Sequence, residues 1–174
     1  SRGRAEPVAI STPVEIERQA SWGDWLKFTP SWTSSGTNPA IGNGAIRGRY
    51  RRRGSEGQVR WHVKIGTTTT FGTAEWRLSL PDGWTVSASD GQTDWYQSCG
   101  GLVVPDAVSA FDIAAWAQPG QTYVRLIYPS AYDTTAGERT ASQSMGPAMP
   151  VTWTASTVNF IAVGTMTLEL EDPL

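Results

Sequence analysis

The chain has 174 residues, which is enough for one domain with a substantial core. Charged residues make up only 17%, and the nine tryptophans, 18 glycines and 11 prolines are typical of a turn-rich β protein, which excludes a disordered chain or a helical bundle. No stretch approaches the ~20 consecutive apolar residues of a membrane helix, so no membrane insertion is expected. Cys99 and His62 are the only residues of their kinds, so an intrachain disulfide is excluded and a zinc site within one chain is not expected.

The net charge of −2 hides a division along the chain. Residues 1–77 carry 12 basic and six acidic side chains, a balance of +6, whereas residues 78–174 carry two basic and ten acidic side chains, a balance of −8. Such a division predicts either opposite faces of one domain or complementary surfaces between copies of it.

Residues 1–31 are predicted to form an extended N-terminal arm, followed by one β-sandwich domain over residues 32–174. The first 17 residues show no sustained period, as in a mobile terminus or in a tether ordered on a neighbouring chain. The end of the arm is dense in aromatic residues, and their joint exposure would leave a large apolar patch. We therefore expect Trp22, Trp25 and Trp32 to dock the arm onto the domain or onto a partner.

Three antiparallel strands are predicted next, over residues 45–53, 58–65 and 74–80, as a β-meander. In the second and third strands apolar and polar side chains alternate strictly with a period of two, the pattern of a half-buried strand, and the first strand has arginines on one face. The glycine-containing segment 54–57 has the length of a hairpin turn. This meander would have a Trp-rich inner face and a strongly basic outer face.

The rest of the chain predicts more strands and no convincing helix. Further strands are expected over residues 84–88, 101–104, 108–117, 123–128 and 158–170. Turn signals separate them, and residues 129–150 form a long loop rich in Pro, Ser, Thr and Gly. About eight short strands predict an all-β fold, an antiparallel β-sandwich that is jelly-roll-like.

The cations of the predicted meander are its sharpest local feature. Those expected together on the outer face are Arg47, Arg49, Arg51, Arg60, His62 and Lys64. Like charges directly opposite each other destabilise a sheet, so we expect them to be offset by an acidic surface of an adjacent subunit, by an anionic cell-wall polymer, or by water and salt. Nucleic acid is the least favoured partner because the chain is acidic overall.

Aromatic residues in predicted loops indicate a possible sugar-binding surface, since aromatic rings stack on sugar rings. The candidate glycan contacts are Trp84, Asp94, Trp95, Tyr96 and Tyr132. Core packing is the alternative for any single tryptophan.

Two runs of sequence carry a resemblance to a known family. The first comprises Phe-Thr-Pro-Ser-Trp-Thr at 28–33, Asn-Pro-Ala-Ile-Gly-Asn-Gly at 38–44 and Gly-Arg-Tyr at 48–50. The second is Gly-Thr-Thr-Thr-Thr-Phe-Gly at 66–72, followed by Trp-Arg-Leu-Ser-Leu-Pro at 76–81. Together they resemble a knob-like C-terminal β-sandwich domain of tail-fibre and other virion proteins from phages of actinobacteria, and residues 150–170 match more loosely. The resemblance implies a trimeric knob on the virion surface with no catalytic motif.

Catalytic chemistry finds little support in the sequence. His62 lies in mid-strand with no Gly-x-Ser-x-Gly turn anywhere, and loop aspartates alone do not define a glycosidase. We expect a non-enzymatic virion protein without cofactor or metal, a homotrimer that contacts other virion proteins through its arm and adheres to a host cell-surface glycan or receptor. The alternatives are a capsid-surface decoration or head-fibre protein anchored by the arm and, third, a glycan-active enzyme or secreted lectin.

Overall fold

A computed structural model describes residues 21–88, 97–105, 110–128, 143–147 and 160–171. These residues form ten β-strands: β1 (Leu26–Phe28), β2 (Trp32–Ser34), β3 (Ala45–Arg53), β4 (Glu56–Lys64), β5 (Trp76–Ser79), β6 (Gln97–Pro105), β7 (Ala110–Ala117), β8 (Tyr123–Tyr128), β9 (Gln143–Ser144) and β10 (Phe160–Glu169). No helix capable of crossing a membrane occurs in this part of the chain.

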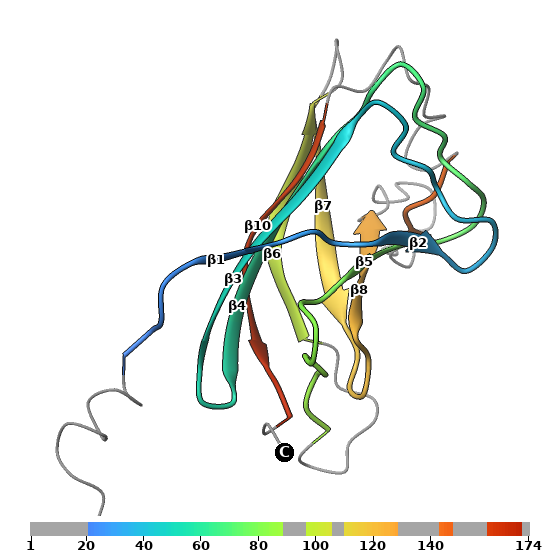
Figure 1. Cartoon of the computed structure of the whole chain (residues 1–174). Helices are drawn as coiled ribbons and strands as arrows, with labels where there is room; N and C mark the ends of the chain where they lie inside the picture. The colour runs from blue at the N-terminus through green and yellow to red at the C-terminus, as the bar shows by residue number, and fades with distance from the viewer. Residues whose placement is uncertain (1–20, 89–96, 106–109, 129–142, 148–159, 172–174) are drawn as a thin grey trace, which may run out of the picture.

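The strands form one antiparallel hydrogen-bonded path in the order β1-β3-β4-β10-β6-β7-β8-β5-β2, with β9 pairing beside β8. The path folds over on itself, so that β3, β4 and β10 lie in one layer and β5 and β8 in the other (Figure 1). The predicted all-β antiparallel sandwich is thereby confirmed. Its jelly-roll character stays a prediction, because several connections between strands lie outside the described residues.

The β3–β4 hairpin is the longest continuous ladder and follows the sequence pattern. Its register runs from Ala45 opposite Lys64 to Arg53 opposite Glu56, and Gly54 takes a positive φ of 57° in the connecting turn. The inner face of β4 is buried, with Val59 and Trp61 at 0% and 2% exposure. Period-two alternation therefore places one face on the core and leaves the other to the cations.

The expected meander is wrong in its third strand. β10, from the far end of the chain, pairs with β4, whereas β5 lies in the other layer between β8 and β2. Alternation fixes which side chains face the core, but it says nothing about which strand lies alongside. The two segments still meet across the core, where the Trp61 indole N–H donates to the Ser79 carbonyl at 3.0 Å.

The chain before β3 crosses from one layer to the other. β1 pairs with β3 at one end of the path, and β2 pairs with β5 at the other end. Trp32 is buried at the start of β2, with its ring edge-on to Trp76 at 5.1 Å. Residues 21–31 of the predicted arm thus lie on the sheet, and residues 1–20 lie outside the described residues.

One short predicted strand differs from the structure. Residues 84–88 form no ladder, and their only pairing is an isolated antiparallel bridge from Val86 to Leu170. The main chain instead anchors to separate segments, because Val86 N donates to the Gln121 carbonyl and Ser87 N to that of Glu169. This segment therefore closes the space between the layers.

Side chains from both layers fill one core. Its largest fully buried members are Trp76, Leu78, Ile113, Leu126, Met145, Ile161, Met166, Leu168, Leu170, Val59 and Val63. Since both layers contribute, the core fixes the position of one layer relative to the other.

Candidate functional site

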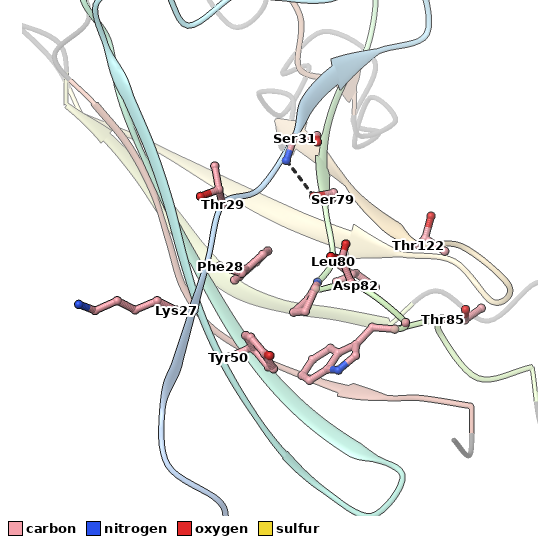
Figure 2. Close-up of a pocket in the computed structure, with 13 residues that line it drawn as sticks. Lys27, Phe28, Thr29, Ser31, Tyr50, Ser79, Leu80, Asp82, Thr85 and Thr122 are labelled. Carbon is pink, nitrogen blue, oxygen red and sulfur yellow. Dashed lines mark hydrogen bonds between the residues drawn. The ribbon is translucent and has the colours of Figure 1, made fainter. Parts of the chain in front are cut away.

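A groove of about 710 Å³ opens beside the crossing segment that links β1 to β2. Its walls come from residues 27–31, from residues 79–85 after β5, from Tyr50 on β3 and from Thr122 before β8. Figure 2 shows Phe28 and Tyr50 pointing into the space between these segments, whereas Lys27 points away from it. Segments that are far apart in the sequence thus share one concave surface.

Three aromatic rings form a row in this groove. Phe28 and Tyr50 meet edge to face at 5.6 Å, and Tyr50 and Trp84 do so at 5.3 Å. Two glycines make the row possible, since a Cβ at Gly48 would collide with the ring of Phe28 and one at Gly57 with that of Trp84. The aromatic row therefore rests on the glycine positions of β3 and β4.

Polar groups surround the aromatic row. The hydroxyl side chains that line the groove are those of Thr29, Ser31, Ser79, Thr85 and Thr122. Asp82 adds an exposed carboxylate, and the Ser31 backbone N–H donates to Ser79 Oγ at 2.9 Å, which fixes the crossing segment against β5 (Figure 2). Aromatic rings beside hydroxyls and a carboxylate can bind a sugar, whose C–H faces pack on rings and whose hydroxyls form hydrogen bonds.

Of the predicted glycan contacts, the structure places one in this groove. Trp84 lines its wall but is only 5% exposed, and the Tyr50 ring packs against it at 5.3 Å. Asp94, Trp95, Tyr96 and Tyr132 lie outside the described residues. Sequence reasoning missed Phe28 and Tyr50. Gly48 was the sequence signal that could have revealed the position of Phe28. An isolated glycine within an arginine-rich strand indicates that another group, here the Phe28 ring, packs against the backbone at that position.

The cations of the β3–β4 hairpin share one face, as alternation predicts. Arg47 lies opposite His62, Arg49 opposite Arg60, and Lys64 opposite Ala45. β1 extends the same face, because Lys27 lies opposite Arg49. Three cations, Lys27, Arg49 and Arg60, therefore stand in one row across β1, β3 and β4. The role of the hairpin cations as a partner contact stays a prediction.

Two of the predicted docking residues lie on this basic face. The Arg51 guanidinium lies 4.9 Å from the Trp22 ring centroid and 4.8 Å from that of Trp25. Arg53 lies 4.8 Å from Trp22, and Arg60 lies 4.1 Å from Trp25. Cation–π attraction thus offsets part of the positive charge with rings of the same chain, a contact that sequence reasoning did not foresee. Arg51 also donates to Gln58 Oε1 at 2.8 Å.

The opposite layer holds a different charged cluster around Glu75. Arg77 and Ser144 donate to its carboxylate at 3.2 Å and 2.7 Å, and Arg125 pairs with it as well. Burial raises the pKa of Glu75, but the hydrogen bonds from Arg125 and Ser144 and the nearby Arg125 charge lower it by more, so the pKa lies below its usual value of 4.5. This carboxylate is only 10% exposed, which marks the cluster as a structural contact.

The described part of the chain contains no cluster of side chains that could bind a metal ion. No three His, Cys, Asp or Glu side chains converge there closely enough to hold an ion. His62 lies exposed on β4 among cations, opposite Arg47. The groove and the basic face are therefore the two candidate sites that these residues offer.

Comparisons with protein-family models, with curated proteins and with solved structures each return no match for this chain.

Proposed function

We propose that this protein is a non-enzymatic adhesion module that binds a cell-surface glycan in the groove beside β1. The observation that carries the proposal is the pair of half-buried rings Phe28 and Tyr50, backed by the buried Trp84 and bordered by hydroxyls and by the Asp82 carboxylate. Ligand sites of this kind are concave, with apolar walls and a few placed polar groups. The groove volume of about 710 Å³ is suited to a short saccharide.

The proposal extends to the setting in which the module works. The motifs at 28–50 and 66–81 resemble those of virion knob domains of phages that infect actinobacteria, and an antiparallel sandwich is the fold which that resemblance implies. We propose a homotrimeric knob of tail-fibre type on the virion surface, joined to other virion proteins through its N-terminal residues.

Binding of the purified chain to cell-wall polysaccharide of an actinobacterium tests the glycan proposal. Asp82→Ala removes a charged hydrogen-bond acceptor from the groove, and we expect it to weaken binding about tenfold. Tyr50→Leu keeps an apolar side chain but removes the ring, with an expected loss of about threefold to tenfold. Affinity is measured by calorimetric titration, and thermal unfolding verifies that each variant folds.

The matched control is Asp24→Ala, an exposed aspartate that does not line the groove. It removes the same charge and should leave the affinity unchanged. Equal affinities of Asp82→Ala, Tyr50→Leu and the unchanged chain would place the ligand elsewhere and defeat the proposal. Release of soluble sugars by the purified chain would instead favour a glycan-active enzyme.

The virion setting has its own test. Antibodies raised against the chain and viewed on phage particles by electron microscopy should label the tail tip. Labelling of the head would favour a capsid decoration protein instead. Light scattering should give three times the chain mass, and a strict monomer at micromolar concentration would contradict the trimer.

A further inference from the structure

A second hollow of about 430 Å³ shares Lys27, Phe28 and Thr29 with the lining of the groove. Its lining comes from the end of β1 and from the start of β3: Lys27, Phe28, Thr29, Ile46, Arg47, Gly48 and Arg49. Three of the seven lining residues carry a positive charge, and the lining contains no carboxylate. The hollow therefore presents positive charge around a floor formed by Phe28 and Ile46.

The three cations of the hollow have no neutralising partner among the described residues. Lys27, Arg47 and Arg49 form no ion pair and no side-chain hydrogen bond with any other described residue. Arg49 is flanked in register by Lys27 on β1 and by Arg60 on β4. Like charges opposed across a sheet are unfavourable, so an anion seated here would relieve a standing repulsion.

The backbone adds unpaired groups to the same place. β1 pairs only with Gly48, Arg49 and Tyr50 of β3 and then departs toward β2. Among the described residues, no strand pairs with the outer edge of residues 45–47, so that edge presents free N–H and C=O groups beside Arg47. Guanidinium groups and backbone N–H groups together are the usual ligands of phosphate and carboxylate oxygens.

The hollow and the groove adjoin at β1, because Lys27, Phe28 and Thr29 line both. A chain-like ligand in the groove would therefore need to cross only this short segment to reach the cations. The exposed Asp82 lines only the groove, whereas Arg47 and Arg49 line only the hollow, which gives the combined surface a polarity. A neutral saccharide would leave the cations unused.

We propose that the ligand is an acidic polysaccharide, and that the Lys27–Arg47–Arg49 hollow binds its anionic group while the groove binds adjacent sugars. This inference rests on the proposed glycan-binding function and adds the ligand class to it. A phosphodiester and a uronate carboxylate share the required chemistry. An acidic surface of a second copy of the chain is the competing occupant.

Titration of the full chain with three polysaccharides tests the inference: phosphomannan as a phosphodiester polymer, alginate as a uronate polymer, and dextran as a neutral one. We expect one or both acidic polymers to bind more tightly than dextran, and the tighter of the two identifies the anionic group. Arg47→Gln and Arg49→Gln should each weaken acidic-polymer binding about tenfold, since each removes a charged hydrogen-bond donor. Higher ionic strength should weaken it further, because screening shortens the reach of the cations.

The matched control is Lys64→Gln, which removes one positive charge from the same face but outside the hollow. It should change acidic-polymer affinity less than twofold if the hollow is the site. An equal loss in Lys64→Gln and Arg47→Gln would indicate diffuse attraction and overturn the proposal. Light scattering of the same variants detects the competing occupant, since dissociation of an oligomer by Arg47→Gln without loss of polymer binding would assign the hollow to a second copy.

The two proposals fail in different ways. If Asp82→Ala weakens glycan binding while Arg47→Gln and Arg49→Gln do not, the groove stands and the acidic class is wrong. If the arginine variants lose acidic-polymer binding while Asp82→Ala and Tyr50→Leu do not, the hollow binds anions and the groove is not the sugar site. If no polymer binds, both proposals fall.

Discussion

The two outer faces of the sandwich each carry a pair of arginines directly opposite one another on neighbouring strands. In one layer Arg77 on β5 faces Arg125 on β8, and Glu75 lies between them and pairs with both. In the other layer Arg49 on β3 faces Arg60 on β4, and no described carboxylate pairs with either. Among the described residues, one arginine pair thus has its own counter-charge, whereas the other has only the Trp25 ring beside Arg60.

The two arginine pairs therefore serve different purposes in the two layers. Around Glu75 the arginines hold three segments together, because β5, β8 and β9 all contribute to the cluster. On the β3–β4 face, Trp25 covers Arg60, but Arg49 remains exposed. We therefore expect substitutions in the first cluster to cost stability and substitutions on the second face to affect binding.

The largest effect is expected from Glu75→Gln. It leaves Arg77 and Arg125 opposed without their carboxylate, and we expect the free energy of unfolding to fall by about 2 kcal/mol. Urea unfolding measures it. Glu56→Gln is the control, because it breaks only the half-exposed pair with Arg53 and should cost about 0.5 kcal/mol or less. Equal losses in the two variants would remove the distinction between the faces.

Acid should weaken the same cluster, since protonation removes the Glu75 charge that pairs with Arg77 and Arg125. The pKa of Glu75 is lower in the folded chain than in the unfolded chain, so the unfolded state takes up the proton first. The stability from this group is complete above the usual pKa of 4.5 and is lost as the pH falls through the folded-state pKa. Urea unfolding at several pH values should show a steeper acid loss in the unchanged chain than in Glu75→Gln, and identical slopes would contradict this.

On the other face, Trp25→Ala should lower the free energy of unfolding by about 1 kcal/mol, because it removes cation–π contacts to Arg51 and Arg60. Trp25→Phe should retain part of that stability. Leu26→Ala is the neighbouring control, since Leu26 is 52% exposed and should matter little. A larger loss from Leu26→Ala would mean that apolar contact, and not the arginines, holds this segment.

The smallest effect has the opposite sign. Arg49→Gln should raise the free energy of unfolding by about 0.3 kcal/mol, because it relieves repulsion with Lys27 and Arg60. The gain should shrink as salt is added. The same change at Arg77 should destabilise the chain, since Arg77 pairs with Glu75. Stabilisation at both positions, measured by urea unfolding, would erase the contrast.

Local structure was predictable where it depended on neighbouring residues. β3 and β8 were expected over the same residues that the structure assigns, because the alternation of β3, the apolar run of β8 and the turns beside them each lie within one short stretch. The outer-face cations of the hairpin follow from the same alternation once the turn at Gly54 sets the register.

Partners from distant segments were not predictable in this way. β10 pairs with β4 although about a hundred residues separate them. The alternating pattern of either strand does not indicate which strand it pairs with. The Glu75 cluster joins side chains from three such segments and was missed entirely. The aromatic row was missed because it depends on where β1 pairs, and a three-residue edge strand has too little pattern to predict.

The crossing from β1 to β2 also bears on the order of folding. The residues of this segment are synthesised before β3 and β5, yet β1 and β2 can pair only when both of those strands are in place. Pairing of β5 in turn requires β8, which lies farther along the chain. The segment that shapes the groove must therefore wait for most of the sandwich, and its docking is a late, non-local step in folding.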